Sequence, residues 1–237
     1  MSDIWGGLTQ AFWLLLTLDA DLVEITLRSL RVTLTALAVA SLIAFPLAAL
    51  ISVRRFRLRR ITIAVLNALM GLPPVVVGLL VYLMLSRSGP LGVLQLLYTP
   101  AAMIIAQVLL VVPIIAALTR QTVETLDAEY TEQLRSLGLS RLASIPVLLW
   151  DGRLALLTAF LAGFGRAIAE VGAVIVVGGN INHVTRVMTT TIALETSKGN
   201  LALALALGAI LVGIAFLVTA LVSMIGISRE REVLHHA

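Results

Sequence analysis

Five long apolar stretches dominate the chain, and each is long enough to cross a lipid bilayer as a helix. A membrane-spanning helix needs about 20 predominantly apolar residues. Five windows of the 237-residue sequence meet this requirement, at about 26–53, 61–85, 97–118, 154–177 and 201–227. Because lipid offers no hydrogen-bond partner to the backbone, such stretches cross as helices. We therefore expect an all-α integral membrane protein with five transmembrane helices, formed by residues 25–228.

The composition agrees with this fold class and excludes several functions. Only 13% of the residues are charged, whereas soluble domains carry about 25%. The chain has no cysteine and three scattered or terminal histidines, so we expect no metal site and no cofactor. It also lacks the G-x-x-x-x-G-K-[ST] motif of P-loop ATPases. The chain is therefore expected not to be an enzyme, and any ATP hydrolysis would come from a partner subunit.

The distribution of arginines predicts the orientation. Eleven of the 17 basic residues lie in residues 54–60, in residues 120–153 or after the last window. Because cytoplasmic loops are enriched in Lys and Arg, these segments are expected in the cytoplasm. The N-terminus is then outside, and residues 229–237 form a cytoplasmic tail. The net charge of +4 is explained by these loops, so no nucleic-acid partner is expected.

Residues 1–24 contain four acidic residues and no Lys or Arg. A secretory signal peptide needs a positively charged start, which this segment lacks. The aromatic residues Trp5, Phe12 and Trp13 favour a short helix lying in the outer membrane interface. A disordered leader is the alternative.

The longest polar connection, residues 120–153, predicts a helix, a break and a second short helix. Thr125 or Asp127 can cap the first helix, Gly138 ends it, and Ser140 can cap the second. Leu134 and Leu137 are three residues apart and are expected to form an apolar ridge. This ridge could dock into a partner's groove, or the segment could simply lie on the membrane.

The fourth window carries two charges, Arg166 and Glu170, one helical turn apart. Charged side chains are costly in hydrocarbon, so these two are expected to face protein or a water-filled path. Alanines surround them on a small-residue face flanked by Gly165 and Gly172, which favours close helix packing. Arg166 could attract an oxyanion through its planar fork, or the pair could be a structural ion pair that locks the fourth helix.

The segment after the fourth window is predicted to lie outside. Gly178-Gly179-Asn180 is typical of a helix end. Thr189 and the two threonines that follow it, together with Arg186, could form an outer vestibule for an anion or a surface for another protein. An ordinary polar loop is the alternative.

The 120–153 connection resembles the E-A-A-x3-G signature of the permease subunits of ABC importers. Glu132 stands six residues before Gly138, as in that signature, with Gln133 and Leu134 in place of the two alanines. The final L-P of the motif is absent. The resemblance implies a coupling loop that docks on an ATPase, with candidate residues Glu132, Gln133, Leu134, Leu137, Gly138 and Arg141.

Three further stretches, 67–92, 99–119 and 164–181, together resemble the tungstate-type permeases, which are close relatives of the molybdate and sulfate permeases. The sequence Ala169-Glu170-Val171-Gly172-Ala173 followed by Gly178-Gly179-Asn180 favours the tungstate branch. The similarity extends through residues 185–208.

This resemblance implies a type I ABC-importer permease in the cell inner membrane that carries tungstate inward by alternating access. It further implies a homodimer, a cytoplasmic ABC ATPase dimer and an extracytoplasmic oxyanion-binding protein, with membrane lipid around it. Arg166, Glu170, Asn180 and Thr189 are the candidate residues of the translocation path or of a structural ion pair. Molybdate or sulfate is the alternative substrate. A membrane scaffold that binds a cytoplasmic partner without transporting anything is the alternative from another class.

Overall fold

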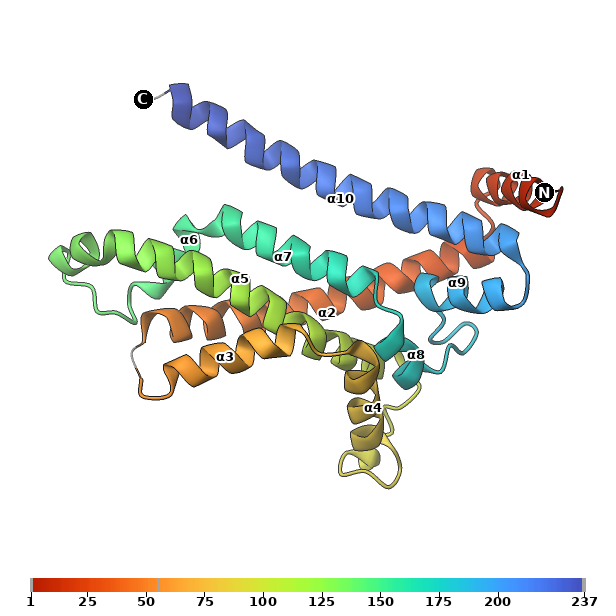
Figure 1. Cartoon of the computed structure of the whole chain (residues 1–237), viewed down its shortest axis with the longest axis horizontal. Helices are drawn as coiled ribbons and strands as arrows, with labels where there is room; N and C mark the ends of the chain where they lie inside the picture. The colour runs from red at the N-terminus through yellow and green to blue at the C-terminus, as the bar shows by residue number, and fades with distance from the viewer. Residues whose placement is uncertain (1, 55, 236–237) are drawn as a thin grey trace. The chain divides into compact units, whose positions relative to one another are not determined.

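The computed structural model describes the backbone of residues 2–54 and 56–235, and side chains within residues 7–54 and 56–220 (Figure 1). Arg55 of the arginine-rich connection and residues 236–237 of the expected tail lie outside these ranges, as does the side chain of Trp5 in the N-terminal segment. All regular structure in the described part is helical, as predicted. The helices are α1 Ser2–Leu16, α2 Ala20–Val53, α3 Arg59–Met70, α4 Pro74–Leu85, η1 Gly92–Leu94, α5 Pro100–Ser136, α6 Ile145–Asp151, α7 Arg153–Ile168, α8 Gly172–Gly178, α9 Met188–Ser197 and α10 Leu201–His235.

Three described helices are long and apolar enough to cross a membrane: α2, α5 and the Leu201–Ala220 part of α10. The number rises to five if two interrupted pairs, α3 with α4 and α6 with α7, each count as one span. The first, third and fifth predicted windows therefore coincide with long helices. The second window does not form one helix, because Gly71, Leu72 and Pro73 separate α3 from α4. Pro73 and Pro74 explain this break, since a residue before proline is pushed out of the helical region.

The 120–153 connection also differs from the prediction. α5 continues without interruption from Pro100 to Ser136, so Thr125 and Asp127 lie inside a helix and cap nothing. The second short helix begins at Ile145, not at Ser140. Ser140 Oγ instead accepts a hydrogen bond from the Ala143 N–H at 3.3 Å within a turn. Gly138 does end the first helix, with a φ of +78° that favours glycine.

The chain divides into two compact units. Unit 1 comprises residues 1–36, 73–107 and 165–217, and unit 2 comprises residues 37–72, 108–164 and 218–237. Each unit is built from segments far apart in the sequence. This division cuts across the predicted windows, because α2, α5, α7 and α10 each contribute to both units.

In unit 1, α4 and α8 approach each other through two glycines. A Cβ atom on Gly78 of α4 would lie 2.8 Å from the Ala173 Cα, and one on Gly172 would lie 2.7 Å from the Val75 side chain. Small residues permit this approach in lipid, where close packing replaces the hydrophobic effect as a driving force. Gly172 therefore has the packing role predicted for it. Gly165 does not, because open space surrounds the position of its absent Cβ.

The α2 helix has a buried face of small side chains and an exposed face of larger ones. Ala36, Ala40, Ala44 and Ala48 recur every four residues and are fully buried. Leu42 lies on the opposite side and is 77% exposed. Residues four apart share one face of a helix. The arrangement therefore suits a membrane helix that packs against protein through alanine and presents larger apolar side chains to lipid.

In unit 2, one glutamate joins two arginines from different helices. Glu124 of α5 binds Arg59 at the start of α3 and Arg120 one turn earlier on α5, each at 2.5 Å. Arg59 also donates to the carbonyls of Ile51 and Ser52, at 3.0 and 3.3 Å. These carbonyls belong to the last turn of α2, where backbone acceptors have no partner within the helix. Arg59 thus caps α2 and ties it to α5.

We predict that Glu124→Gln lowers the free energy of unfolding by about 1–2 kcal/mol, because two partly buried guanidinium groups lose their carboxylate. The thermal denaturation of the detergent-solubilised protein would measure this loss. Glu129→Gln is the matched control, since Glu129 is exposed on the same helix. Equal melting temperatures for the two variants would contradict the bridging role of Glu124.

Candidate functional site

The predicted fourth span is interrupted where its two charges lie. α7 ends at Ile168 and α8 begins at Gly172, so the continuous helix expected over 154–177 does not form. Glu170 lies in the break. Its backbone N–H donates to the Ala167 carbonyl at 3.2 Å, and its Oε1 accepts the Ala173 N–H at 2.9 Å. A carboxylate that accepts a free N–H at the start of a helix stabilises that start, so Glu170 caps α8.

Arg166 and Glu170 form the predicted ion pair. The Arg166 guanidinium donates to Glu170 Oε2, the oxygen that does not cap α8. The Glu170 side chain is 3% exposed and that of Arg166 is 30% exposed. The charge of the buried carboxylate is therefore compensated by the guanidinium and by a backbone N–H, as a buried charge requires.

Two side chains from other segments donate hydrogen bonds to backbone carbonyls at the break. Gln107 of α5 donates through Nε2 to the Ala167 carbonyl at 3.1 Å. Thr189 of α9 donates through Oγ1 to the Glu170 carbonyl at 2.8 Å. Irregular backbone is tolerated at membrane depth only where protein or water supplies the missing bonds. Gln107 and Thr189 supply them on the two sides of the break.

A small polar cavity lies beside the break within unit 1. Its polar lining comes from Ser29, Thr33, Gln107, Glu170 and Thr189. Gln107 Oε1 is buried and has no hydrogen-bond partner among the described residues. The centre of a water molecule can occupy a volume of about 10 Å³ in this cavity. This volume is enough for about one water molecule. A tetrahedral oxyanion carries four oxygens around its central atom, so this cavity is too small to hold one.

The structure shows which polar residues the sequence analysis missed. Gln107 is the one amide side chain in the third apolar window, and Ser29 and Thr33 are spaced four apart near the start of the first. A lone amide inside an apolar stretch indicates a buried polar contact, because a side chain within the membrane must find its hydrogen-bond partners in the protein. Its partner, the Ala167 carbonyl, is 60 residues away along the chain and could not be identified from spacing.

The segment after α8 is folded, and the threonines within it up to Thr191 are buried. Gly179 has a φ of +68° and ends α8, as predicted. Thr190 Oγ1 lies 2.9 Å from Asn180 Oδ1, and Thr191 Oγ1 donates to the Val187 carbonyl at 2.7 Å. Thr190 and Thr191 are fully buried. These threonines therefore belong to helix α9 and do not line an exposed vestibule in this structure.

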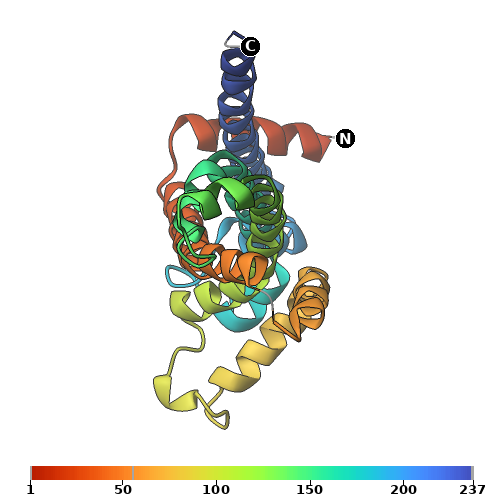
Figure 2. The ribbon, with the colours of Figure 1, turned by 90° about the vertical axis from the view of Figure 1, so that its left-hand side faces the viewer.

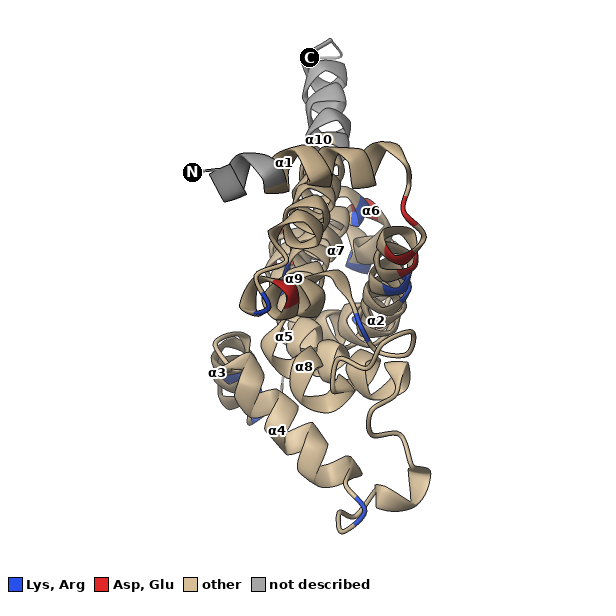
Figure 3. Ribbon diagram, turned by 90° about the vertical axis from the view of Figure 1, so that its right-hand side faces the viewer, with Lys and Arg blue, Asp and Glu red and all other residues tan. Residues whose placement is uncertain are grey.

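The same segment is attached to α2 by charged and polar groups. Arg28 donates to the carbonyls of His183 and Arg186, at 2.7 and 3.4 Å, and Ser29 Oγ accepts the Met188 N–H at 2.6 Å. Acidic and basic residues gather at the start of α2 and at α9 in Figure 3. At the end of α9, a hydrogen bond from Lys198 lowers the pKa of the Glu195 carboxyl.

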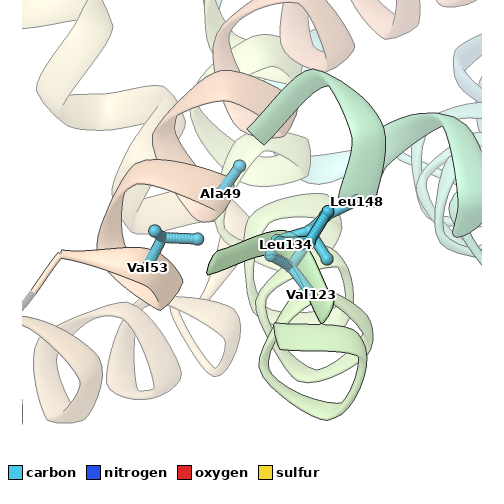
Figure 4. Packing of buried hydrophobic residues seen from close by; sticks show 5 residues of the cluster. All are labelled: Ala49, Val53, Val123, Leu134 and Leu148. Atoms are coloured by element: carbon cyan, nitrogen blue, oxygen red, sulfur yellow. The ribbon is translucent and has the colours of Figure 1, made fainter. Parts of the chain in front are cut away.

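The candidate coupling segment rests on a small apolar core in unit 2. Figure 4 shows Leu134 beside Leu148 and Val123, with Ala49 and Val53 of α2 across from them. Leu134 is 9% exposed, whereas Leu137 is 76% exposed. The two leucines therefore do not form one apolar ridge, and that expectation is wrong. The reason is that the helix ends at Ser136, so Leu137 no longer follows the helical spacing.

Several side chains of this segment are free to meet a partner. Glu132, Gln133 and Arg141 are exposed, as is Leu137 at the Gly138 turn. Leu142 is 55% exposed and Trp150 of α6 is 72% exposed. Exposed apolar groups rimmed by polar ones are typical of protein interaction sites.

A model of the family described as "Binding-protein-dependent transport system inner membrane component" matches residues 25–227. The chain belongs to this family. The match covers the five predicted windows and stops short of α1 and the end of α10. The chain is thus a permease subunit of the ABC-transporter class and a multi-pass protein of the inner membrane.

Individual relatives of the permease match over most of their length. It is 41% identical to the tungstate uptake system permease protein TupB of Peptoclostridium acidaminophilum, over 94% of this chain and 97% of that one. It is 35% identical to the TupB protein of Campylobacter jejuni, over 90% and 89%. A probable anion ABC transporter permease protein of Haloferax volcanii is 38% identical, over 84% and 88%.

The Arg166–Glu170 ion pair is expected to stabilise the permease, because Glu170 is buried and caps α8. We predict that Arg166→Met destabilises the permease by about 3 kcal/mol, because it leaves a buried carboxylate without its cation. Adding Glu170→Gln should recover a coupling energy of about 1–3 kcal/mol, since the amide oxygen still accepts the Ala173 N–H. Thermal melting of the purified variants in detergent gives both values.

Arg141→Met is the control for loss of an arginine, because Arg141 is exposed. Additive effects of Arg166→Met and Glu170→Gln would show that the two side chains do not stabilise each other.

Proposed function

We propose that this chain is the permease subunit of an ABC importer for a tetrahedral oxyanion, and that the anion is tungstate. The observation that carries the proposal is the end-to-end similarity to two tungstate uptake permeases, at 41% and 35% identity. The similarity to a sulfate permease of Salmonella typhimurium is lower, at 26%. The two tungstate permeases are matched over 97% and 89% of their length, so the likeness extends far beyond a single span.

In the proposed assembly, two copies of the permease form a homodimer with a cytoplasmic ABC ATPase dimer and an extracytoplasmic oxyanion-binding protein. Residues 1–24 lie at the outer face, residues 25–228 form the membrane domain, residues 120–153 contact the ATPase and residues 229–237 form the tail. ATP binding closes the ATPases and opens the permeases outward, and hydrolysis returns them inward. The cavity beside Glu170 is too small for the anion, so we expect the path of the anion to lie outside the core of unit 1.

We infer that Arg166, Glu170, Asn180 and Thr189 have structural roles in this machinery. Glu170 has both carboxylate oxygens engaged, one by Arg166 and one by the Ala173 N–H. Thr189 donates its hydroxyl to a backbone carbonyl. An anion would have to displace these bonds to reach the donors, which leaves buried groups unpaired at a cost of about 1–3 kcal/mol each. The proposed function therefore relies on other residues for contact with the anion.

The coupling role of residues 120–153 has support from packing and exposure. Leu134 and Leu148 anchor the segment in the core of unit 2, and Gly138 turns the chain so that Leu137 stands free. Because the apolar cluster supports the turn at Gly138, a displacement of the docked ATPase can be passed on to the helices without unfolding the turn. Glu132, Gln133 and Arg141 are exposed in the same segment and offer polar groups that can set the orientation of the docked ATPase.

The transport proposal predicts the uptake of tungstate by cells. Deletion of the chain should abolish the accumulation of tungsten supplied as tungstate at nanomolar concentration, and re-expression should restore it. Elemental analysis of washed cells by mass spectrometry measures the uptake. Unchanged tungsten with a loss of molybdenum or sulfate would assign the permease to that anion instead. Unchanged uptake of all three would overturn the importer assignment.

The coupling proposal predicts that Glu132→Lys leaves the chain in the membrane but lowers tungstate uptake at least about tenfold, because it reverses a charge at the docking surface. Glu129→Lys is the matched control, because Glu129 is exposed one turn earlier on the same helix and is not one of the candidate coupling residues. Membrane fractionation checks insertion, and co-purification with the ATPase checks docking. Wild-type uptake by Glu132→Lys would remove this residue from the coupling surface.

A further inference from the structure

One arginine stands alone in a long uncharged part of the chain. Arg87 is the only Asp, Glu, Lys or Arg between Arg60 and Arg120. It follows the C-terminal end of α4, in the connection that leads through η1 to α5. In Figure 3 this turn carries the blue of a basic residue, and no red acidic residue is drawn beside it. The function proposed above uses no residue of this connection.

The connection is folded tightly, and two glycines require that fold. Figure 2 shows it leaving α4, passing through η1 and returning to the start of α5. A Cβ atom on Gly89 would lie 2.1 Å from the Leu83 carbonyl oxygen, and one on Gly92 would lie 2.3 Å from the Ser86 carbonyl oxygen. No side chain fits at such distances, so only glycine permits this loop.

Backbone hydrogen bonds fix both ends of the loop. The Leu91 N–H donates to the Met84 carbonyl at 2.9 Å, and the Gly89 N–H donates to the Ser86 carbonyl at 2.8 Å. At the far end, the Tyr98 N–H donates to the Val177 carbonyl of α8 at 3.0 Å. The loop is therefore a built part of unit 1 that holds Arg87 in a defined place.

Arg87 lines a groove of about 630 Å³. Besides Arg87, the polar residues that line the groove are Tyr82, Ser86, Ser88, Gln95 and Tyr98. The rings of Tyr82 and Tyr98 meet edge to face, with centroids 6.4 Å apart, and form one wall. Gln95 and Tyr98 have φ angles of +50° and +62°. Such conformations are costly for residues other than glycine, and they tend to occur at functional sites.

The charge in the groove is uncompensated. None of the lining residues is acidic. Within the part of the chain whose side chains are described, no carboxylate forms an ion pair with Arg87. A groove lined by one sign of charge concentrates ions of the opposite sign. The guanidinium can bond two oxygens of an oxyanion at once, while hydroxyl and amide groups can donate to the others.

We propose that this groove is the first binding site of the permease for the anion, a site on the outer face that receives a tetrahedral oxyanion through Arg87. The proposal rests on the importer function and on the outward placement of residues 86–99 that the arginine distribution predicts. The groove is wide enough for an oxyanion, whereas the cavity beside Glu170 holds about one water. Because the groove is open and carries one cation, it binds the anion weakly and lets it move on.

Cysteine labelling tests the location of the groove and its contact with the anion. The chain has no native cysteine, so Ser88→Cys creates a single reactive thiol. A membrane-impermeant maleimide should label it from outside intact cells. In the assembled transporter, tungstate should slow the labelling at least about tenfold, while chloride at the same ionic strength should not. Labelling from the cytoplasmic side only, or labelling at one rate in both salts, would overturn the proposal.

Uptake by the reconstituted transporter tests the charge. Arg87→Gln should lower the rate of tungstate uptake about tenfold at low ionic strength. The difference should shrink near 1 M salt, where the Debye length is only about 3 Å. Arg87→Lys should keep most of the activity, because a positive charge remains. Arg31→Gln is the control for loss of an exposed arginine expected on the same face.

Three further results separate a failure of this proposal from a failure of the importer function. If Arg87→Gln transports like the wild type while the wild type takes up tungstate, the groove is not an anion site and the importer function stands. If the variant loses binding of the tungstate-loaded binding protein, measured by co-sedimentation with proteoliposomes, the groove is a protein contact and the proposal is overturned. Absence of uptake by the wild type would contradict the importer function itself.

Discussion

An interrupted helix in an apolar chain frees backbone groups that lipid cannot satisfy, and unit 1 is organised around this constraint. Glu170 closes the gap between α7 and α8 by capping α8 and binding Arg166. Gln107 and Thr189 reach the carbonyls on the two sides of the gap. These bonds bring α5, α7, α8 and α9 together at one point. The break therefore explains why polar residues occur inside otherwise apolar stretches.

The apolar windows were sufficient to predict a helical membrane protein, and residue chemistry was sufficient for the turns at Gly138 and Gly179. The Arg166–Glu170 contact also followed from spacing, because both residues lie within one local segment. Spacing gave no sign of the break that follows Ile168. The backbone at the break is bound by side chains distant in sequence, such as Gln107, and local spacing does not identify them. Leu137 was assigned to the wrong environment for a related reason, since its position depends on where α5 ends.

The charged residues of the two units divide into two kinds. Glu124 and Glu170 are surrounded by arginines or backbone donors and hold helices together. Arg87 and Glu132 stand in turns or on exposed surfaces without such partners among the described residues. A carrier that releases its cargo on each cycle benefits from this division. Charges that maintain the fold are kept occupied, while charges available to ligands or partners remain at the ends of helices.

The contact between Arg59 and Glu124 has a consequence for the biogenesis of the protein. Arg59 belongs to the arginine-rich connection on which the predicted orientation depends, and its guanidinium caps α2 and binds Glu124. Its carboxylate partner is 65 residues further along the chain, so the ribosome synthesises α3, α4 and most of α5 before this contact can form. The contacts of Arg59 with the end of α2 can therefore form during synthesis before Glu124 is available, and the link to α5 is added only afterwards.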